Sequence, residues 1–261
     1  MNAALRRPLN ATFLRSALGP PWRHLEVVEE TGSTNADLIA RAAAGEDIDG
    51  VVLIAEHQTA GRGRSGRTWS AAPRAQLTLS VGVAAADVPA PVWGWLPLAA
   101  GLAVVDTVET VGVQAALKWP NDVLAGSGKL AGVLSEVAGQ TIVVGIGLNV
   151  TLRADEVKEP LVTSLADLGI ADPDRTALAT ELLRRLGERV TGWRTGDQRL
   201  LTEYRSRCTT IGASVRAVLP GGREVVGTAI SVDNQGRLRI DAQPDVVAVT
   251  AGDVVHLRPN L

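Results

Sequence analysis

The sequence predicts an α+β protein in two parts, a larger part over residues 1–210 and a small β-rich part over residues 211–261. In the larger part, segments with helical spacing of apolar residues are interspersed with short apolar runs typical of strands. After Cys208 only short β-prone segments follow, separated by turns rich in glycine, proline, asparagine and aspartate. A length of 261 residues and a hydrophobic fraction of 46% are sufficient for a large core.

The larger part carries its predicted elements in a defined order. Residues 1–24 lack sustained periodicity and are expected to be irregular or partly helical. Ser33-Thr34-Asn35 is an N-cap cluster that begins a helix, and Gly45 ends it. The remaining elements are strands over 51–55 and 77–83, a helix over 97–111, a strand over 113–119, a strand pair over 130–137 and 141–150, and a long helix from Asp172-Pro173 to about Trp193. The alternation over 113–119 directs Lys118 away from the apolar face of its strand.

The small part carries five short segments with strand character. They span residues 214–219, 225–232, 238–240, 246–250 and 254–257. Their even spacing and the turns between them predict a separate small β-barrel.

Composition and charge exclude several classes of protein. With 26 basic and 28 acidic side chains and a net charge of −2, the chain has no general attraction to nucleic acid. No apolar run reaches the roughly 18–20 residues that span a bilayer, and no signal-peptide segment is recognisable, so a cytoplasmic location without membrane contact is expected. Cys208 is the single cysteine, which excludes an intrachain disulfide and a cysteine-based zinc site. The three histidines lack metal-ligand spacing, and no protein metal site is expected.

A glycine- and arginine-rich loop over residues 61–67 follows the strand over 51–55. It matches G-x-G-x-x-G, but Thr68-Trp69-Ser70 leads to Pro73 and another strand, whereas a dinucleotide site needs a helix there. Gly126-Ser127-Gly128-Lys129 likewise fails as a P-loop, because Leu130 replaces the required serine or threonine. Two interpretations stay open for residues 61–67, a solvated surface loop and a mobile lid whose arginines grip an anionic ligand.

Five motifs in a fixed order give the most specific indication of function in the sequence. They are Ser33-Thr34-Asn35, Glu56-His57-Gln58-Thr59-Ala60 leading into the loop, Lys118-Trp119-Pro120-Asn121-Asp122, the stretch Lys129-Leu130-Ala131-Gly132-Val133-Leu134-Ser135-Glu136, and Gly145-Ile146-Gly147-Leu148-Asn149-Val150. Together they resemble the biotin protein ligases, the family of biotin-[carboxylase] ligases and holo-carboxylase synthetases, over residues 26–261. The resemblance implies a mixed β-sheet flanked by helices, similar to class II aminoacyl-tRNA synthetase catalytic domains, followed by an SH3-like β-barrel.

The resemblance also implies a two-step reaction. Biotin and ATP give biotinyl-5′-AMP and pyrophosphate, and the biotinyl group then passes to one lysine of an apo biotin carboxyl carrier domain. Mg²⁺ is expected to enter with ATP, because the sequence offers no dedicated protein site for it. Nucleic acid is not an expected partner, since only about 25 residues precede the catalytic pattern, too few for a helix-turn-helix domain. A monomer or a weak dimer is expected.

The site residues follow from the resemblance and from the chemistry. Lys129, Arg64 and Asp122 are the predicted catalytic residues, with Lys129 bridging the biotin carboxylate and the phosphate and Asp122 orienting the acceptor amine. The predicted ligand-binding residues are Ser33, Thr34, Asn35 and Gln58 for the ureido ring; Gly61, Arg62, Gly63, Arg64 and Arg67 in the lid; Trp69 and Asn149 for adenine; Lys118, Asn121 and Lys129 for polar and charged groups; and Gly132, Gly145 and Gly147 for close approach of the backbone.

Structural interpretations of the same motifs stay open. Ser33-Thr34 caps a helix in any case, Asn121-Asp122 could form only a turn, and Gly145-Ile146-Gly147 could be a bulged core strand. At the level of function, the alternatives are a lipoate ligase or octanoyltransferase and a non-catalytic biotin sensor.

The lysine content supports a local role for positive charge. The chain contains three lysines, Lys118, Lys129 and Lys158, and two of them fall inside the motifs while arginine is used almost everywhere else. We infer that a compact ammonium is required at Lys118 and Lys129, where a planar guanidinium would not reproduce the contact.

Overall fold

The computed structural model describes residues 6–126, 128–157, 161–219, 221–250 and 252–257. Its elements, in chain order, are α1 (Ala11–Ala17), β1 (His24–Thr31), α2 (Thr34–Ala43), β2 (Val51–Gln58), η1 (Arg64–Gly66), β3 (Gln76–Ala84), η2 (Ala90–Val92), α3 (Trp95–Glu109), β4 (Ala115–Lys118), β5 (Asp122–Ala125), β6 (Gly128–Ala138), β7 (Thr141–Asn149), η3 (Ala154–Glu156), α4 (Arg175–Thr195), α5 (Gln198–Arg207), β8 (Ser214–Val218), β9 (Glu224–Val232), β10 (Leu238–Asp241), β11 (Val246–Val249) and β12 (Asp253–His256). Lys158 lies outside the described residues.

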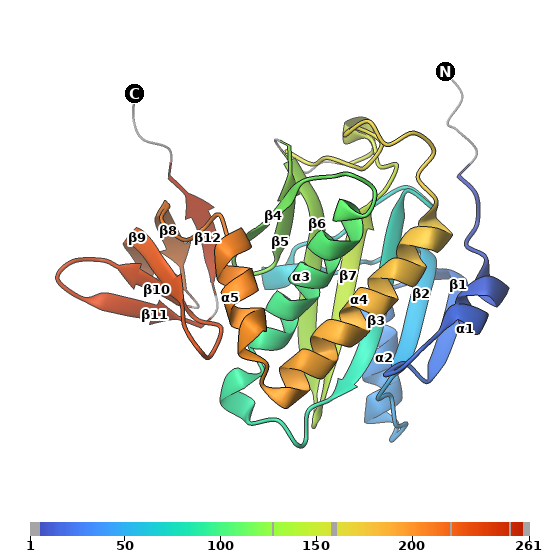
Figure 1. The fold of residues 1–261 in the computed structure, drawn as a ribbon, viewed down its shortest axis with the longest axis horizontal. Helices are drawn as coiled ribbons and strands as arrows, with labels where there is room; N and C mark the ends of the chain where they lie inside the picture. The colour runs from blue at the N-terminus through green and yellow to red at the C-terminus, as the bar shows by residue number, and fades with distance from the viewer. Residues whose placement is uncertain (1–5, 127, 158–160, 220, 251, 258–261) are drawn as a thin grey trace.

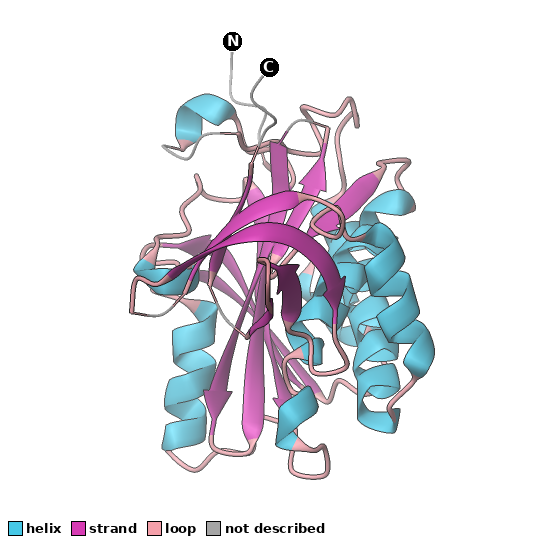
Figure 2. Cartoon of the chain, turned by 90° about the vertical axis from the view of Figure 1, so that its left-hand side faces the viewer, coloured by secondary structure: helices cyan, strands magenta, loops and turns pink. Residues whose placement is uncertain are grey.

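A seven-stranded mixed sheet forms the centre of the larger part. Its order is β1-β2-β3-β7-β6-β5-β4, in which β1 and β2 are parallel and the other neighbours are antiparallel. Helices α3 and α4 cover one face of the sheet and α2 packs on the other face (Figure 1). Figure 2 shows helices on both sides of the same sheet. The mixed α+β architecture predicted from the sequence is confirmed.

The two faces of the central strands differ in character, as the two-residue period of a strand allows. On β3, Leu77 and Leu79 belong to the main hydrophobic core, while Gln76, Thr78 and Ser80 alternate with them. On β7, glycines 145 and 147 lie opposite these polar residues, with Ser80 paired to the first and Thr78 to the second. The face that carries α2 is therefore polar and glycine-lined at its centre, whereas the face under α3 and α4 is apolar.

Helix α3 is the central core helix. Residues Ala90–Glu109 have a mean hydropathy of 1.3, enough by length and composition to cross a membrane, which corrects the expectation that no such segment exists. However, 72% of this stretch is buried inside the protein, since α3 is held between the sheet, α4 and α5. Trp95 contacts Tyr204 of α5 edge to face, with ring centroids 5.6 Å apart. The apolar character of α3 is therefore explained by burial in the protein interior.

The C-terminal part is a five-stranded antiparallel sheet with the order β11-β10-β9-β8-β12. All five strands coincide with predicted segments, and the sheet curves toward the viewer in Figure 2. The hydrogen-bonded order among the described strands is that of an open sheet, so closure into a barrel stays a prediction. A side-chain hydrogen bond joins the two parts: the Trp119 indole donates to Gly236 O at 3.0 Å.

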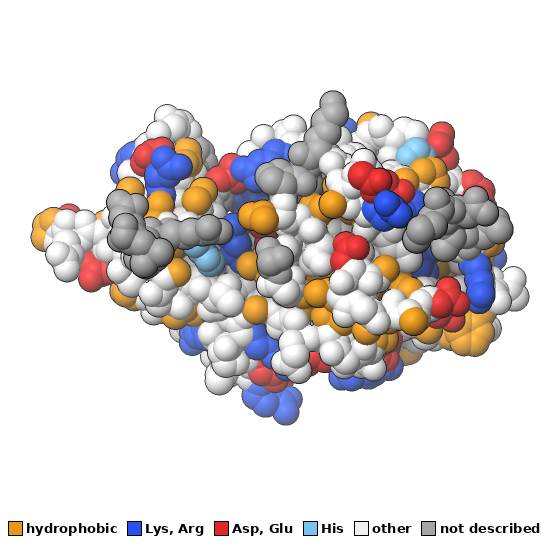
Figure 3. Space-filling model, turned by 90° about the horizontal axis from the view of Figure 1, so that it is seen from above, with side chains coloured by type: hydrophobic (Ala, Val, Ile, Leu, Met, Phe, Trp, Pro, Cys, Tyr) orange, Lys and Arg blue, Asp and Glu red, His pale blue; other side chains and the backbone are white. Residues whose placement is uncertain are grey.

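Several elements differ from the prediction. Strands β1 and β5 and helix α5 were not predicted, and α4 begins at Arg175, two residues later than Pro173. Asp174 caps α4 by accepting from Thr176 N and Ala177 N, which explains this start. Charged side chains of both signs are interspersed on the face shown in Figure 3, as the near-zero net charge suggests.

Candidate active site

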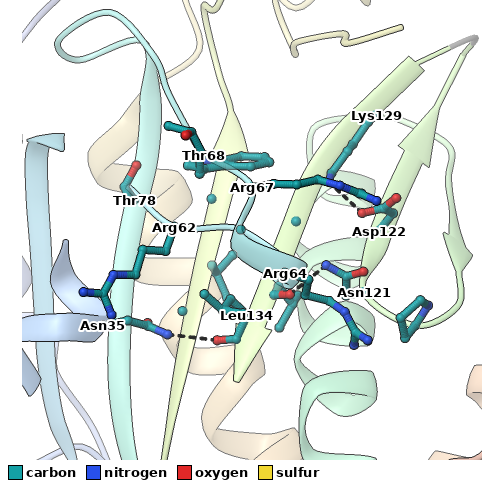
Figure 4. A pocket seen from close by; sticks show the side chains of 18 of the residues that line it. Asn35, Arg62, Arg64, Arg67, Thr68, Thr78, Asn121, Asp122, Lys129 and Leu134 are labelled. Atoms are coloured by element: carbon teal, nitrogen blue, oxygen red, sulfur yellow. Dashed lines mark hydrogen bonds and ion pairs between the residues drawn. The ribbon is translucent and has the colours of Figure 1, made fainter. Parts of the chain in front are cut away.

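A cavity of about 380 Å³ lies on the polar face of the sheet, between the N-terminus of α2 and the 61–67 loop. Its size is within the usual range for small-molecule sites. Most of the predicted site residues line it: Ser33, Thr34, Asn35, Gln58, Arg62, Gly63, Arg64, Arg67, Trp69, Lys118, Asn121, Asp122, Lys129, Gly132, Gly145 and Gly147. Residues from segments far apart in the sequence are thus brought together in one place (Figure 4).

Glycines on β6 and β7 make room for two of the lining side chains. A Cβ atom on Gly147 would lie 2.5 and 2.6 Å from the Cε2 and Cζ2 atoms of Trp69. A Cβ atom on Gly145 would overlap the amide of Asn35, with Cγ at 3.0 Å. The sequence analysis assigned these glycines to close approach of a ligand, but here the space above them is occupied by protein side chains. They therefore allow Trp69 and Asn35 to approach the sheet closely.

A connected polar network forms one wall of the cavity, where α2 meets β2, β3 and β6. Gln58 Oε1 accepts from Thr34 N at 2.8 Å, and Thr34 Oγ1 lies 2.7 Å from Ser80 Oγ. The Ser80 hydroxyl donates to Asn35 Oδ1 at 2.6 Å, and Asn35 Nδ2 donates to Glu136 Oε2 at 2.8 Å. Because these side chains are hydrogen-bonded to one another, the wall presents donors and acceptors in fixed positions to a bound ligand.

Ser33 has the capping role that its sequence position predicted. Its hydroxyl oxygen accepts from Ala36 N at 3.4 Å, at the start of α2. Its own hydroxyl hydrogen has no acceptor among the hydrogen bonds of the described residues. Capping and a ligand contact are therefore compatible at Ser33.

The opposite end of the cavity is cationic. Lys129 Nζ lies 2.7 Å from Asp122 Oδ1 and 5.1 Å from the centroid of the Trp69 ring. Both charged side chains are partly exposed, at 28% for Lys129 and 21% for Asp122. The Trp69 indole donates to Gln76 Oε1 at 2.9 Å, which fixes the plane of the ring. An aromatic platform and an ammonium therefore lie next to each other, an arrangement suited to a nucleotide base and an anionic group.

The 61–67 loop crosses the cavity and contacts the C-terminal sheet. Arg67 forms an ion pair with Asp253 at the start of β12, and Arg64 Nη2 approaches Gly252 O at 3.5 Å. Burial lowers the pKa of Arg64, while the carboxylates of Asp253 and Asp122 act in the opposite direction. Arginine nevertheless stays charged, so Arg64 is a partly desolvated cation available to an anionic ligand. Of the two interpretations, this geometry favours the lid over a solvated loop.

Two predicted site residues do not line the cavity. Gly61 is buried against Trp69, whose backbone N–H donates to Gly61 O at 2.8 Å. Asn149 uses both amide hydrogens inside the protein, donating to Lys129 O at 3.1 Å and to Thr163 O at 2.9 Å. The structure gives both residues a supporting position, and the contact of Asn149 with adenine stays a prediction.

Residues of the Lys118–Asp122 motif have divided roles. Trp119 is buried and its indole donates to Gly236 O at 3.0 Å, so it anchors the motif to the C-terminal part. Asn121 Nδ2 donates to Val133 O at 3.0 Å, and Lys118, Asn121 and Asp122 all line the cavity. The motif is therefore more than a turn, because it anchors the chain and also lines the cavity.

Sequence analysis missed several participants. Thr78 and Ser80 could have been found from their alternation with leucines on β3, and Glu136 lies within a quoted motif. Asp253 carried no recognisable signal, because its place at the cavity depends on how the two parts of the chain pack.

Comparisons with known proteins show the family of this chain. The family described as "Biotin/lipoate A/B protein ligase family" matches residues 33–151, and "Biotin protein ligase C terminal domain" matches residues 210–257. The biotin--[acetyl-CoA-carboxylase] ligase of Mycobacterium tuberculosis is 58% identical over 261 residues, covering 97% of this chain and 98% of that protein. The bifunctional ligase/repressor BirA of Escherichia coli is 34% identical over 240 residues, covering 87% and 71%.

Solved structures show the same architecture. The biotin protein ligase from Aquifex aeolicus in complex with biotin and ATP has a TM-score of 0.78 and 26% identity, covering 91% of this chain and 100% of that one. The ligase from Leishmania major in complex with biotinyl-5-AMP has a TM-score of 0.64 and 26% identity, covering 92% and 100%. With the ordered motifs gathered around one cavity and near full-length identity of 58% to a known ligase, the chain belongs to the biotin protein ligase family.

Proposed function

We propose that this chain activates biotin with ATP and transfers the biotinyl group to one lysine of the biotin carboxyl carrier domain of an acyl-CoA carboxylase. The observation that supports this most is a single cavity that joins a polar hydrogen-bonding wall to a cationic, aromatic end. A cyclic urea needs both donors and acceptors, while a carboxylate meeting a triphosphate needs positive charge.

In the first step, a biotin carboxylate oxygen attacks the α-phosphorus of ATP. The new P–O bond forms as the bond between the α- and β-phosphates breaks, and pyrophosphate leaves with the electron pair. Both reactants are anionic, so the chain contributes mainly positioning and positive charge from Lys129, Arg64 and Lys118. Arg62 and Arg67 support the phosphates from the loop, and Trp69 stacks on adenine. Lys129 exchanges its ion pair with Asp122 for the incoming anion.

The loop protects the intermediate. Biotinyl-5′-AMP is a mixed anhydride that water hydrolyses, so a lid held by Arg67 and Asp253 limits its loss before the acceptor arrives.

In the second step, the ε-amine of the carrier lysine attacks the acyl carbon and AMP leaves. The amine must first lose a proton, and we assign Asp122, released from Lys129, to orient it. Mg²⁺ is proposed to arrive bound to the phosphates of ATP. Among the residues that the structure describes, no group of three or more His, Cys, Asp or Glu side chains is placed to hold a metal ion.

Finer parts of this account are proposals of the same kind. They are a cytoplasmic location, a monomeric or weakly dimeric state, no nucleic-acid partner, a likeness of the larger part to class II aminoacyl-tRNA synthetase catalytic domains, and an SH3-like C-terminal part.

Lipoate transfer is the main alternative, because one matching family includes lipoate ligases. The polar wall argues against it, since the dithiolane ring of lipoate carries no N–H or carbonyl group to pair with Gln58 and Thr34. A non-catalytic sensor would not need Lys129 and the loop arginines around one anionic ligand.

Biotin-dependent exchange of labelled pyrophosphate into ATP tests the proposal. We expect exchange with biotin, little with lipoate and none without an acid substrate. Exchange with lipoate but not with biotin would overturn the assignment.

A further inference from the structure

Two buried amide side chains, Gln76 on β3 and Asn149 on β7, connect the Trp69 ring to the backbone of Lys129. The Trp69 indole N–H donates to Gln76 Oε1 at 2.9 Å, and Gln76 Nε2 donates to Asn149 Oδ1 at 2.8 Å. Asn149 Nδ2 then donates to Lys129 O at 3.1 Å and to Thr163 O at 2.9 Å. Strand β7 lies between β3 and β6, so these hydrogen bonds cross three neighbouring strands of the sheet (Figure 1).

The chemistry of the two ends fixes the direction of this chain of hydrogen bonds. An indole N–H can only donate, and a backbone carbonyl can only accept. Gln76 must therefore turn its oxygen toward Trp69 and its nitrogen toward Asn149, and Asn149 must turn its nitrogen toward Lys129 O. Gln76 is 5% exposed and Asn149 is 1% exposed, so a missing donor or acceptor would leave a buried polar group unpaired.

The two ends are held to different degrees. Lys129 N also donates to Leu161 O at 2.7 Å, and Lys129 O also accepts from Thr163 N at 3.0 Å, so the Lys129 backbone is held without the amides. The Trp69 ring has a single N–H, and Gln76 accepts it. Loss of the Gln76 amide should therefore free the orientation of the ring and leave Lys129 in place.

We propose that Gln76 is a positioning residue for the nucleotide, which acts through Trp69 and, with Asn149, holds the aromatic platform in a fixed place relative to Lys129. The inference rests on the proposed function, in which adenine stacks on Trp69 and Lys129 meets the phosphate. Lys129 Nζ lies 5.1 Å from the centroid of the ring. Since one ATP molecule must reach both groups, a ring without its hydrogen bond binds the nucleotide less tightly.

The test measures two dissociation constants on the full chain by calorimetry, one for a non-hydrolysable ATP analogue in the presence of biotin and one for biotin alone. Gln76→Leu replaces the amide by an apolar side chain of similar size with neither donor nor acceptor. We expect it to weaken binding of the analogue about tenfold. Biotin affinity should change by less than about twofold, because the polar wall at Gln58 and Thr34 has its own hydrogen bonds.

Gln76→Glu tests the direction of the hydrogen bonds. An ionised carboxylate accepts from Trp69 but places a second acceptor against Asn149 Oδ1, whereas a protonated carboxyl group donates its O–H to that oxygen. Burial favours the protonated form, so the ratio of variant to wild-type Kd for the analogue should decrease from about tenfold at pH 8 toward unity at pH 5. The ratio for Gln76→Leu should not depend on pH. Gln140→Glu adds the same charge at an exposed turn and should match wild type throughout.

A double variant separates an effect through Trp69 from a general effect on the fold. Trp69→Phe keeps an aromatic ring without the N–H, so adding Gln76→Leu to it should weaken the analogue no further. Thermal unfolding shows whether each variant is folded, and if Gln76→Leu is not, the pH dependence of Gln76→Glu decides.

Four results would overturn the inference: wild-type affinity for the analogue in folded Gln76→Leu, an equal loss of biotin affinity, a further loss in the double variant, or a Gln76→Glu ratio that does not change with pH. A wild-type chain that binds neither biotin nor the analogue would instead refute the proposed function.

Discussion

Adding one methyl group at Gly147 tests how closely the adenine platform is fitted to the sheet. In Gly147→Ala the new Cβ would lie 2.5 Å from Trp69 Cε2, about 0.9 Å short of the ordinary contact distance of 3.4 Å. The backbone of β7 is paired on both sides, so the indole must move outward instead. Such a shift breaks the 2.9 Å hydrogen bond from Trp69 to Gln76 and displaces the ring toward Lys129.

The cost follows from these two losses. Overpacking by one methyl group costs about 1–3 kcal/mol, and one net hydrogen bond about 1 kcal/mol. If a cost near 1.4 kcal/mol falls on ligand binding, ATP affinity in the presence of biotin decreases about tenfold. Calorimetry with a non-hydrolysable ATP analogue measures this decrease.

A matched control removes the general effect of replacing glycine by alanine. Gly19 has no neighbour within 4 Å of an added Cβ, so Gly19→Ala should leave ATP affinity unchanged. Wild-type affinity in a folded Gly147→Ala variant would refute the assignment of Trp69 as the platform under adenine.

Three further predictions concern charge. Lys129→Ala should largely abolish adenylate formation, measured as pyrophosphate release, with an unchanged circular dichroism spectrum, and Lys129→Arg should restore little because a planar guanidinium cannot replace a compact ammonium. Asp253→Ala should speed the dissociation of biotinyl-5′-AMP several-fold in a chase experiment while changing the free energy of unfolding by less than about 1 kcal/mol, since its partner Arg67 is 62% exposed. Burial and the charge of Lys118 lower the pKa of His256 below its ordinary value of 6.5, so the unfolded chain binds more protons and stability decreases as the pH falls below 6.5. His256→Gln should lose less stability than wild type between pH 7 and pH 5 in denaturant titrations. Near-normal pyrophosphate release by Lys129→Ala would contradict the first expectation, and unchanged dissociation of biotinyl-5′-AMP from Asp253→Ala would contradict the second. Identical pH profiles of wild type and His256→Gln would contradict the third.

The sequence predicted most of the architecture because strong periodicity marks buried elements. Strands β2, β3, β6 and β7 and helices α2, α3 and α4 are long and have a regular apolar pattern. Strand β5 has four residues, and its first residue, Asp122, was read only as part of a motif. Helix α5 buries Leu200 and Tyr204 alone, so its apolar stripe is too thin to be recognised.

The candidate site was predictable in its residues but less so in their roles. The motifs contain most of the residues that line the cavity, because these residues occur in short polar and glycine-rich patterns that can be recognised in the sequence. What Gly145 and Gly147 accommodate could not be predicted, because Asn35 above the first comes from α2 and Trp69 above the second comes from the segment after the 61–67 loop. The place of Asp253 at the site could not be predicted for the same reason, since only tertiary packing brings it to Arg67.

Transfer of a biotinyl group to a carrier lysine tests the central claim most directly. Intact-mass spectrometry should follow an apo biotin carboxyl carrier domain incubated with this chain, ATP and an equal mixture of biotin and lipoate. The account predicts the added mass of one biotinyl group on a single lysine, no addition without ATP, and none when that lysine is replaced by arginine. An unmodified carrier domain, or one carrying lipoate in place of biotin, would contradict it.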